Sequence, residues 1–319
     1  MLKWFVCPDD EQVLIEECLN RCRMGERCLT QPTLRYLSKE REWSGEPSTT
    51  QLLNGTMYEF LKLTNDYGIH PESRAFALLG SIHHKTLEEQ AKELGLPAEI
   101  SLTDNDKNIF DLLEVEFDEE NLPIYTLTDY KTWGSFKVAK TLGIKVVREV
   151  DEPYTNKQGK QSIRKKKIFE EVSEEGDNGE VTYQLNRYRY ILEDKYGINV
   201  KNLFIQITVR DGGLQVATSR GVDKLIYKRS IADVPRHVID NYFGEKHRNL
   251  LKALEDNEWD MPCTPEERWG GTRCERFCEV APLCKFSSMD KLGLVQEIPS
   301  ANWNIQYPEG TVFASTTRG

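Results

Sequence analysis

The sequence predicts an α/β fold in which helices flank a central mixed β-sheet and a cysteine-rich, metal-bound segment lies at each end. Three observations lead to this prediction. Segments with helical periodicity surround two groups of short segments that are rich in branched and aromatic residues. A chain of 319 residues is long enough to bury a large core. The eight cysteines lie only near the two ends of the chain.

The elements follow one another as helices, a group of strands, a helix, further strands and a last helix. Helices are expected where apolar residues recur at helical spacing, over 11–22, 50–65, 72–94, 181–196 and 234–256. Strands are expected over 109–117, 124–130, 144–150, 203–209, 214–218 and 225–228, and 118–121 is typical of a hairpin connection. This order divides the chain into a cysteine-rich segment at 1–40, a central domain at 41–258, a second cysteine-rich segment at 259–286 and a tail at 287–319.

The cysteines form two quartets with the same spacing, C-x10-C-x3-C-x5-C. The first quartet is Cys7, Cys18, Cys22 and Cys28, and the second is Cys263, Cys274, Cys278 and Cys284. Thiolates at fixed short spacing are typical ligands of a soft metal or an iron–sulfur cluster. Disulfide frameworks belong mainly to small secreted domains, so the pattern favours metal binding over disulfides.

The charge of the chain does not by itself indicate a partner. The net charge of −10 comes from 52 acidic and 42 basic residues, whereas a phosphate-binding surface is expected to be basic. A basic run precedes an acidic stretch at 170–180 and has two interpretations, a solvated hairpin or a mobile loop. Its members are Lys157, Lys160, Arg164, Lys165, Lys166 and Lys167. With no secretory leader and no apolar stretch long enough to span a bilayer, we expect a cytoplasmic protein without membrane contact.

A polar group is predicted where the second strand of the hairpin ends. Asp129 and Lys131 lie two residues apart, so they point to the same face of a strand. Asp111, in the preceding strand, is expected to face Asp129 across the hairpin. Two carboxylates that hold a hard cation beside a lysine are what phosphodiester hydrolysis requires. The alternative interpretation is a surface ion pair.

Two helices add polar residues to this group. His84 follows Gly80 by one helical turn, and the glycine leaves room on that face, so the imidazole could reach the same metal ion. Gln184 and Tyr188 share one face of the helix predicted at 181–196.

These residues resemble the motifs of the PD-(D/E)xK nuclease superfamily, especially its RecB/AddB-like and CRISPR-associated Cas4-like exonuclease branch. That branch shows Gly-x-x-x-His, an Asp after an apolar run, (D/E)-x-Lys and Gln-x-x-x-Tyr. The matching residues occur here in the same order, as Gly80 and His84, Asp111, Asp129-Tyr130-Lys131, and Gln184 and Tyr188. Glu114 and Glu116 compete with Asp111 as the upstream carboxylate.

The resemblance implies a restriction-endonuclease-like αβββαβ core and metal-dependent, exonucleolytic cleavage of single-stranded or end-containing DNA. It assigns Mg²⁺ or Mn²⁺ to His84, Asp111, Asp129 and the Tyr130 carbonyl group. Lys131 would orient the attacking water and stabilise the phosphate, and Gln184 and Tyr188 would brace the site or contact the phosphate backbone. The basic run would then guide the DNA strand.

The same branch carries a [4Fe–4S] cluster bound by one early cysteine and three late ones. Cys28 with Cys274, Cys278 and Cys284 would correspond to these ligands, although the late triad here is one residue longer in its first gap. Four cysteines remain for a second cluster or for Zn²⁺, namely Cys7, Cys18, Cys22 and Cys263. Either each quartet binds its own metal, or a second site takes ligands from both ends.

Two other functional classes remain open at this stage. One is a non-catalytic DNA-binding or assembly module that keeps the fold and its metal sites. The other is a zinc-stabilised protein in which the Asp129-Tyr130-Lys131 triplet is coincidental. The resemblance to phage-encoded exonucleases implies DNA as the main partner, and it admits phage or host recombination and replication proteins as others.

Overall fold

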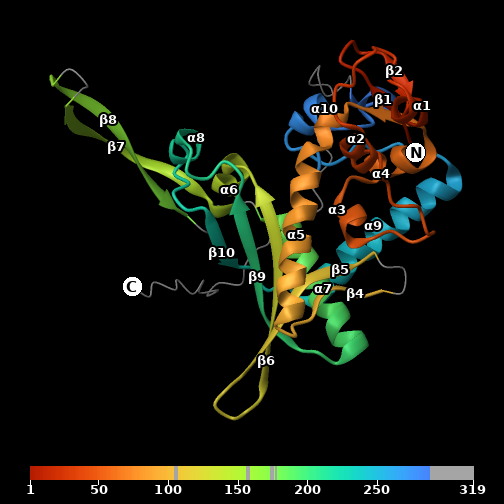
Figure 1. The fold of residues 1–319 in the computed structure, drawn as a ribbon. Coiled ribbons are helices and arrows are strands. Elements are labelled where there is room, and N and C mark those ends of the chain that lie inside the picture. The colour runs from red at the N-terminus through yellow and green to blue at the C-terminus, as the bar shows by residue number, and fades with distance from the viewer. Residues whose placement is uncertain (104–106, 156–158, 173–175, 177, 288–319) are drawn as a thin grey trace.

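The structure, a computed structural model, describes residues 1–103, 107–155, 159–172, 176 and 178–287. It has a mixed α/β architecture in which helices flank a five-stranded sheet with the strand order β10-β9-β6-β5-β4 (Figure 1). These strands are β4 (Ala98–Ser101), β5 (Ile109–Phe117), β6 (Pro123–Trp133), β9 (Val200–Val209) and β10 (Ile226–Ser230). The predicted α/β class is therefore confirmed.

The sheet is mixed because only β6 and β9 run parallel to each other. The other neighbouring pairs, β4–β5, β5–β6 and β9–β10, are antiparallel. A parallel pair needs a long crossover connection. Here the chain between β6 and β9 supplies it with α6 (Ser135–Leu142), a two-stranded ribbon and α7 (Gly179–Tyr196).

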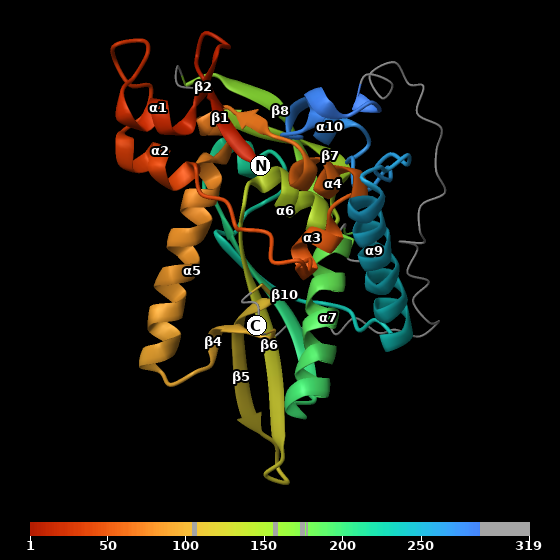
Figure 2. The ribbon, with the colours of Figure 1, turned by 90° about the vertical axis from the view of Figure 1, so that its right-hand side faces the viewer.

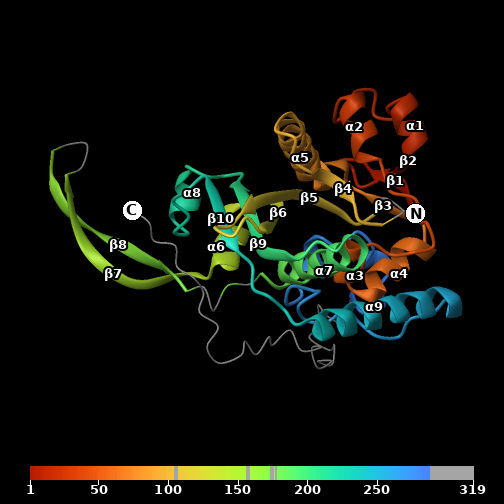
Figure 3. The same ribbon diagram turned by 90° about the horizontal axis from the view of Figure 1, so that it is seen from below.

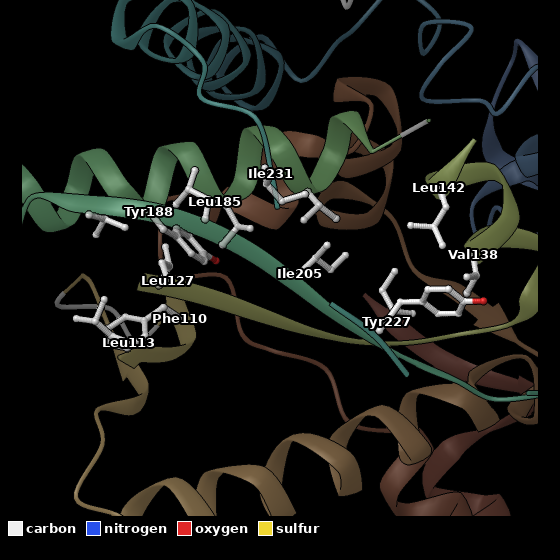
Figure 4. Packing of buried hydrophobic residues seen from close by; sticks show 14 of the residues in the cluster. Phe110, Leu113, Leu127, Val138, Leu142, Leu185, Tyr188, Ile205, Tyr227 and Ile231 are labelled. Atoms are coloured by element: carbon white, nitrogen blue, oxygen red, sulfur yellow. The ribbon is translucent and has the colours of Figure 1, made fainter. Parts of the chain in front are cut away.

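Two long helices, α5 (Ala75–Glu93) and α7, cover opposite faces of the sheet (Figure 2). On the α5 side, Ala91 packs with Leu112 and Tyr130. On the α7 side, Leu185 packs in one cluster with Leu127, as Figure 4 shows. Because neighbouring residues of a strand point to opposite faces, this alternation places each helix over its own side.

A second core lies between the N-terminal segment and α9 (Arg236–Asp256). It is built from a three-stranded sheet, β2-β1-β3, and from short helices whose Leu34 and Leu52 are buried in the same cluster as Ile239 and Leu250 of α9. The remaining helices are α1 (Ile15–Asn20), α2 (Gln31–Leu37), α3 (Thr49–Leu53), α4 (Thr56–Thr64), α8 (Gln215–Thr218) and α10 (Thr272–Arg276). The three strands are β1 (Leu2–Val6), β2 (Gln12–Leu14) and β3 (Tyr67–Ile69), and 3-10 turns occur at Pro71–Arg74 and Ala281–Leu283.

The basic run belongs to a two-stranded ribbon that extends away from the body of the protein (Figures 1 and 3). The ribbon pairs β7 (Ile144–Thr155) with β8 (Gln161–Glu171). Glu152 forms ion pairs with Arg164 and Lys166 of the opposite strand. The hairpin interpretation therefore fits the described residues better than the loop, and β7 compensates part of the positive charge. Lys157 lies outside the described residues.

Most of the strongly periodic elements are found where the sequence predicts them, and three predictions need correction. Residues 12–14 form β2 instead of the start of a helix, so only Ile15–Asn20 is helical. The helix predicted at 50–65 is interrupted at Gly55, where a Cβ atom would lie 2.2 Å from the Cys263 Sγ atom. The strand predicted at 214–218 is the short helix α8, which follows the Gly212-Gly213 turn and buries Ala217.

No helix in the described part of the chain combines the length and apolar character needed to cross a lipid bilayer. Apart from Ser287, the predicted tail lies outside the described residues.

Candidate active site

The predicted carboxylates lie where β5 and β6 separate. The pairing of these two strands runs from Phe117 opposite Pro123 to Leu112 opposite Thr128, and Asp111 and Asp129 are the next residues beyond that last pair. From this point β6 continues to Trp133 beside β9 alone. Beyond the last pair, the backbone N–H of Tyr130 donates to a side-chain atom of β5, the Asp111 Oδ2 atom, at 2.5 Å. This fork brings two buried carboxylates together, as the hairpin pattern predicts.

Asp129 connects the catalytic candidates of β6 and α7. The Lys131 Nζ atom lies 2.6 Å from the Asp129 Oδ2 atom, and the Gln184 amide donates to the Asp129 Oδ1 atom at 3.3 Å. Asp129 is only 3% exposed, so water screens this ion pair poorly. The arrangement fixes the Lys131 ammonium group beside the fork.

His84 approaches the fork from α5 and meets two carboxylates. Its Nδ1 atom lies 3.0 Å from the Glu99 Oε1 atom and 3.5 Å from the Asp111 Oδ1 atom. Ligand atoms of these three residues all lie within 4.8 Å of one another, as a metal ion requires. Glu99 comes from β4, so a fifth element contributes to the site.

Glu99 is the residue of this site that the sequence did not reveal. It lies in β4, a four-residue strand that was not predicted. Its neighbours Ala98 and Ile100 pair with Leu112 and Phe110, so Glu99 lies opposite Asp111. Its φ angle of +51° is uncommon for a residue with a side chain, and such strain concentrates at functional sites. Only the pairing register of β4 against β5 could have identified it.

The charges at the fork perturb the ionisation of its members. Burial, together with the neighbouring Asp129 carboxylate, raises the pKa of Asp111 to about 7. The hydrogen bond that the Glu99 carboxylate accepts from His84 raises the pKa of His84 against the opposing effect of burial. For Lys131, burial lowers the pKa, but the Asp129 and Asp111 carboxylates outweigh it and the net shift is upward. Crowded carboxylates of this kind are stabilised by a bound cation.

Tyr188 is buried and lies beside Gln184. Its side chain is only 3% exposed and packs in the core over Leu127 (Figure 4). Burial raises its pKa to about 12, and its hydroxyl group is hydrogen-bonded to Gln184. The Tyr130 ring packs edge-on against His83 and His84, at centroid distances of 6.0 and 6.3 Å.

The two competing carboxylates of β5 lie away from the fork. Glu114 is opposite Thr126 and Glu116 is opposite Ile124, both within the paired part of the hairpin. Neither belongs to the group of candidate metal ligands in the described residues, so the geometry favours Asp111.

The cysteines group by terminus. The four cysteines of the first quartet line one pocket. The pKa of Cys18 is raised mainly by burial and, to a smaller extent, by the other three cysteines of this quartet. In the second quartet, Cys284 adds to the effect of burial in raising the pKa of Cys263, Cys274 and Cys278. None of the eight forms a disulfide. Cys28 therefore lies with the N-terminal cysteines, which differs from the one-plus-three arrangement that the resemblance implies.

Comparisons with protein-family models, with curated proteins and with solved structures find no match for this chain.

Proposed function

We propose that this protein is a metal-dependent deoxyribonuclease that hydrolyses phosphodiester bonds, most simply as an exonuclease. The observation that carries the proposal is the fork between β5 and β6. It places two buried carboxylates, an imidazole and a lysine ammonium group at one point of the sheet. A surface ion pair between Asp129 and Lys131 would not need four further polar residues from four other elements, namely His84, Glu99, Asp111 and Gln184.

His84, Glu99 and Asp111 would hold Mg²⁺ or Mn²⁺. Asp129, which lies outside this group of ligand atoms, and the Tyr130 carbonyl group are further candidate ligands. The donor set fits a hard cation because it consists of oxygen atoms and one imidazole. When bound, such an ion supplies a Lewis acid for the phosphate and lowers the pKa of a bound water molecule.

The chain's own residues provide the remaining chemistry. Asp129 holds Lys131, and the ammonium group of Lys131 then orients the attacking water and stabilises negative charge on the phosphate. Gln184 holds the second oxygen atom of Asp129, and Tyr188 holds Gln184. His84 would bind the cation as neutral imidazole, through a ring nitrogen that carries no proton.

The order of the elements supports an αβββαβ core. One helix (α5), three antiparallel strands (β4, β5 and β6), a second helix (α7) and a parallel strand (β9) follow one another in chain order. Helix α6 and the β7–β8 ribbon would then be an insertion between the third strand and the second helix.

Each cysteine quartet would hold its own metal centre. The C-terminal quartet, Cys263, Cys274, Cys278 and Cys284, would bind the [4Fe–4S] cluster. The N-terminal quartet would bind a second cluster or Zn²⁺. We assign these two centres a structural role and the hydrolysis to the fork.

The decisive experiment combines anaerobic purification with a cleavage assay. We expect the purified protein to show the visible absorption of an iron–sulfur cluster and to cleave end-labelled single-stranded DNA with Mn²⁺. Lys131→Ala and Asp111→Ala should each lose about a hundredfold or more of the rate. Glu116→Gln is the matched control, because this exposed carboxylate lies on the same strand outside the fork.

Cleavage that survives both substitutions would refute the active-site assignment. Binding without cleavage in the wild-type protein would favour the non-catalytic DNA-binding or assembly module. A colourless protein that contains zinc would refute the proposed iron–sulfur cluster but would not affect the nuclease proposal.

A further inference from the structure

Two exposed phenylalanines, each next to an arginine, lie beyond the carboxyl ends of β6 and β9. Phe76 in the first turn of α5 is 60% exposed, and Phe136 in the first turn of α6 is 69% exposed. The guanidinium group of Arg210 lies 3.6 Å from the centre of the Phe76 ring. The guanidinium group of Arg220 lies 5.8 Å from the centre of the Phe136 ring. We call these four residues the stacking platform.

Described contacts join the two halves of the platform. The backbone N–H of Arg210 donates to the Trp133 carbonyl group at 2.8 Å. A Cβ atom on Gly134 would lie 3.6 Å from the Arg210 Nη2 atom, so this guanidinium group reaches the start of α6. Arg220 donates to the Ser135 hydroxyl group at 2.8 Å, next to Phe136. The platform is therefore anchored on the turn that directly follows β6.

The same elements connect the platform to the proposed active site. Phe76 and His84 lie on one helix, eight residues apart, which is about 12 Å along its axis. That length corresponds to roughly three to four stacked nucleotides. On the other side, Lys131 and the turn at Gly134 belong to one short stretch of chain, at the end of β6. A strand bound at the fork would thus pass over the platform.

We propose that the stacking platform binds the bases of single-stranded DNA three to four nucleotides from the cleaved bond, which rests on the proposed nuclease function. Exposed aromatic rings next to cations suit this ligand, because bases stack on the rings while the guanidinium groups contact phosphates. A duplex keeps its bases stacked inside the helix, so it cannot use the rings in this way.

The test measures binding without cleavage, in the Lys131→Ala background with Ca²⁺ in place of Mn²⁺. Fluorescence anisotropy is recorded with a thymidine oligonucleotide, with an abasic oligonucleotide of the same length and with a blunt duplex. Phe76→Ala and Phe136→Ala should each weaken binding of the thymidine strand by about fivefold to a hundredfold. Binding of the abasic strand and of the duplex should change less than twofold.

Phe117→Ala is the matched control, because this phenylalanine is 63% exposed at the far end of β5. Thermal melting of each variant shows whether it is folded. Equal binding by the Phe76, Phe136 and Phe117 variants would overturn the proposal, as would an equal loss for the abasic strand. If the wild-type protein cleaves DNA but the Phe76→Ala and Phe136→Ala variants bind it normally, only the platform proposal is refuted. If these variants lose binding of the thymidine strand but the wild-type protein does not cleave DNA, only the nuclease proposal is refuted.

Discussion

Glu99 combines a strained backbone with a contact to a candidate metal ligand. Its φ angle of +51° costs free energy, and its carboxylate accepts the contact from His84 at 3.0 Å. A residue that served only the fold would not need this conformation, since glycine adopts it without strain. The geometry therefore suggests that stability is given up for cation binding.

Two substitutions at Glu99 separate stability from cation binding. Glu99→Gly should raise the free energy of unfolding by about 1 kcal/mol, because it relieves the strained φ angle. Both Glu99→Gly and Glu99→Gln should weaken Mn²⁺ binding by roughly tenfold to a hundredfold. Calorimetry measures both quantities. Glu89→Gln, at an exposed position of the helix that carries His84, should leave Mn²⁺ binding unchanged. A Glu99→Gly variant with full Mn²⁺ affinity would exclude Glu99 as a ligand.

The raised pKa of Asp111 gives the site a defined pH dependence. Bound metal requires the ionised carboxylate, and the pKa of this group is about 7 because it is buried beside Asp129. The raised pKa of His84 acts in the same direction, since protonated imidazole cannot bind a cation. The affinity for Mn²⁺ should therefore be roughly tenfold lower at pH 6 than at pH 8.

The metal-free protein should respond to pH in the opposite direction. A carboxyl group with a pKa raised from 3.8 to about 7 binds its proton more tightly in the folded state. Its contribution to stability is complete below about pH 4 and is lost as the pH rises through 7. The melting temperature of the metal-free protein should fall between pH 5 and pH 8 more steeply for the wild type than for Asp111→Asn. Identical slopes would show that Asp111 is not perturbed.

At the scale of single elements, two glycines test how α6 is joined to the ribbon. Gly143 ends α6 and Gly197 ends α7, both with a φ angle of +64°. A Cβ atom on Gly143 would lie 2.1 Å from the Val172 carbonyl oxygen, whereas nothing lies within 4 Å of one on Gly197. Gly197→Ala should cost about 1 kcal/mol, for the left-handed conformation alone.

Gly143→Ala should cost clearly more than that, because the backbone of Val172 must move as well. Chemical denaturation of both variants measures the difference. Equal losses would mean that the junction between α6 and the ribbon adjusts without cost. In that case the ribbon is not held rigidly against the sheet.

The sequence was most informative where one element carries its own periodicity. The helices α5 and α7 and the strands β5 and β6 follow from their patterns, and the hairpin pattern also places Asp111 opposite Asp129. Short elements were missed because three to five residues carry too little periodicity, as β4 and α8 illustrate. Glu99 was missed for the same reason, since its place in the site depends on how β4 pairs with β5.

At the scale of the whole molecule, ion pairs fasten the C-terminal cysteine segment to the second core. Glu279 lies 2.9 Å from the Arg74 Nε atom and 3.1 Å from the Lys62 Nζ atom, and all three side chains are largely buried. Lys246 of α9 lies 2.5 Å from Glu267 in the same segment. These contacts join residues far apart in the sequence, so a metal centre in this segment would connect α4, α9 and the C-terminal region.

The last prediction concerns which cysteines share a metal centre. Substituting one cysteine in each quartet distinguishes the possible arrangements. If each quartet has its own metal, Cys28→Ser should lower the metal content of the N-terminal quartet and leave the iron–sulfur spectrum of the C-terminal quartet unchanged. If the one-plus-three arrangement holds instead, Cys28→Ser should abolish that spectrum, since Cys28 would be a cluster ligand. Metal analysis and visible spectroscopy on anaerobically purified variants distinguish the two outcomes.

Cys263→Ser is the companion variant, and it should have the larger effect on stability. Burial raises the pKa of the Cys263 thiol to about 12, so this group becomes a thiolate only when a metal compensates its charge. It also lies against Gly55, between α3 and α4 of the second core, whereas Cys28 is exposed. We expect Cys263→Ser to lower the free energy of unfolding by several kcal/mol, on the order of the loss of a structural metal. Cys28→Ser should lower the free energy of unfolding less than Cys263→Ser does. A larger loss for Cys28→Ser would mean that the N-terminal quartet contributes more to the stability of the fold.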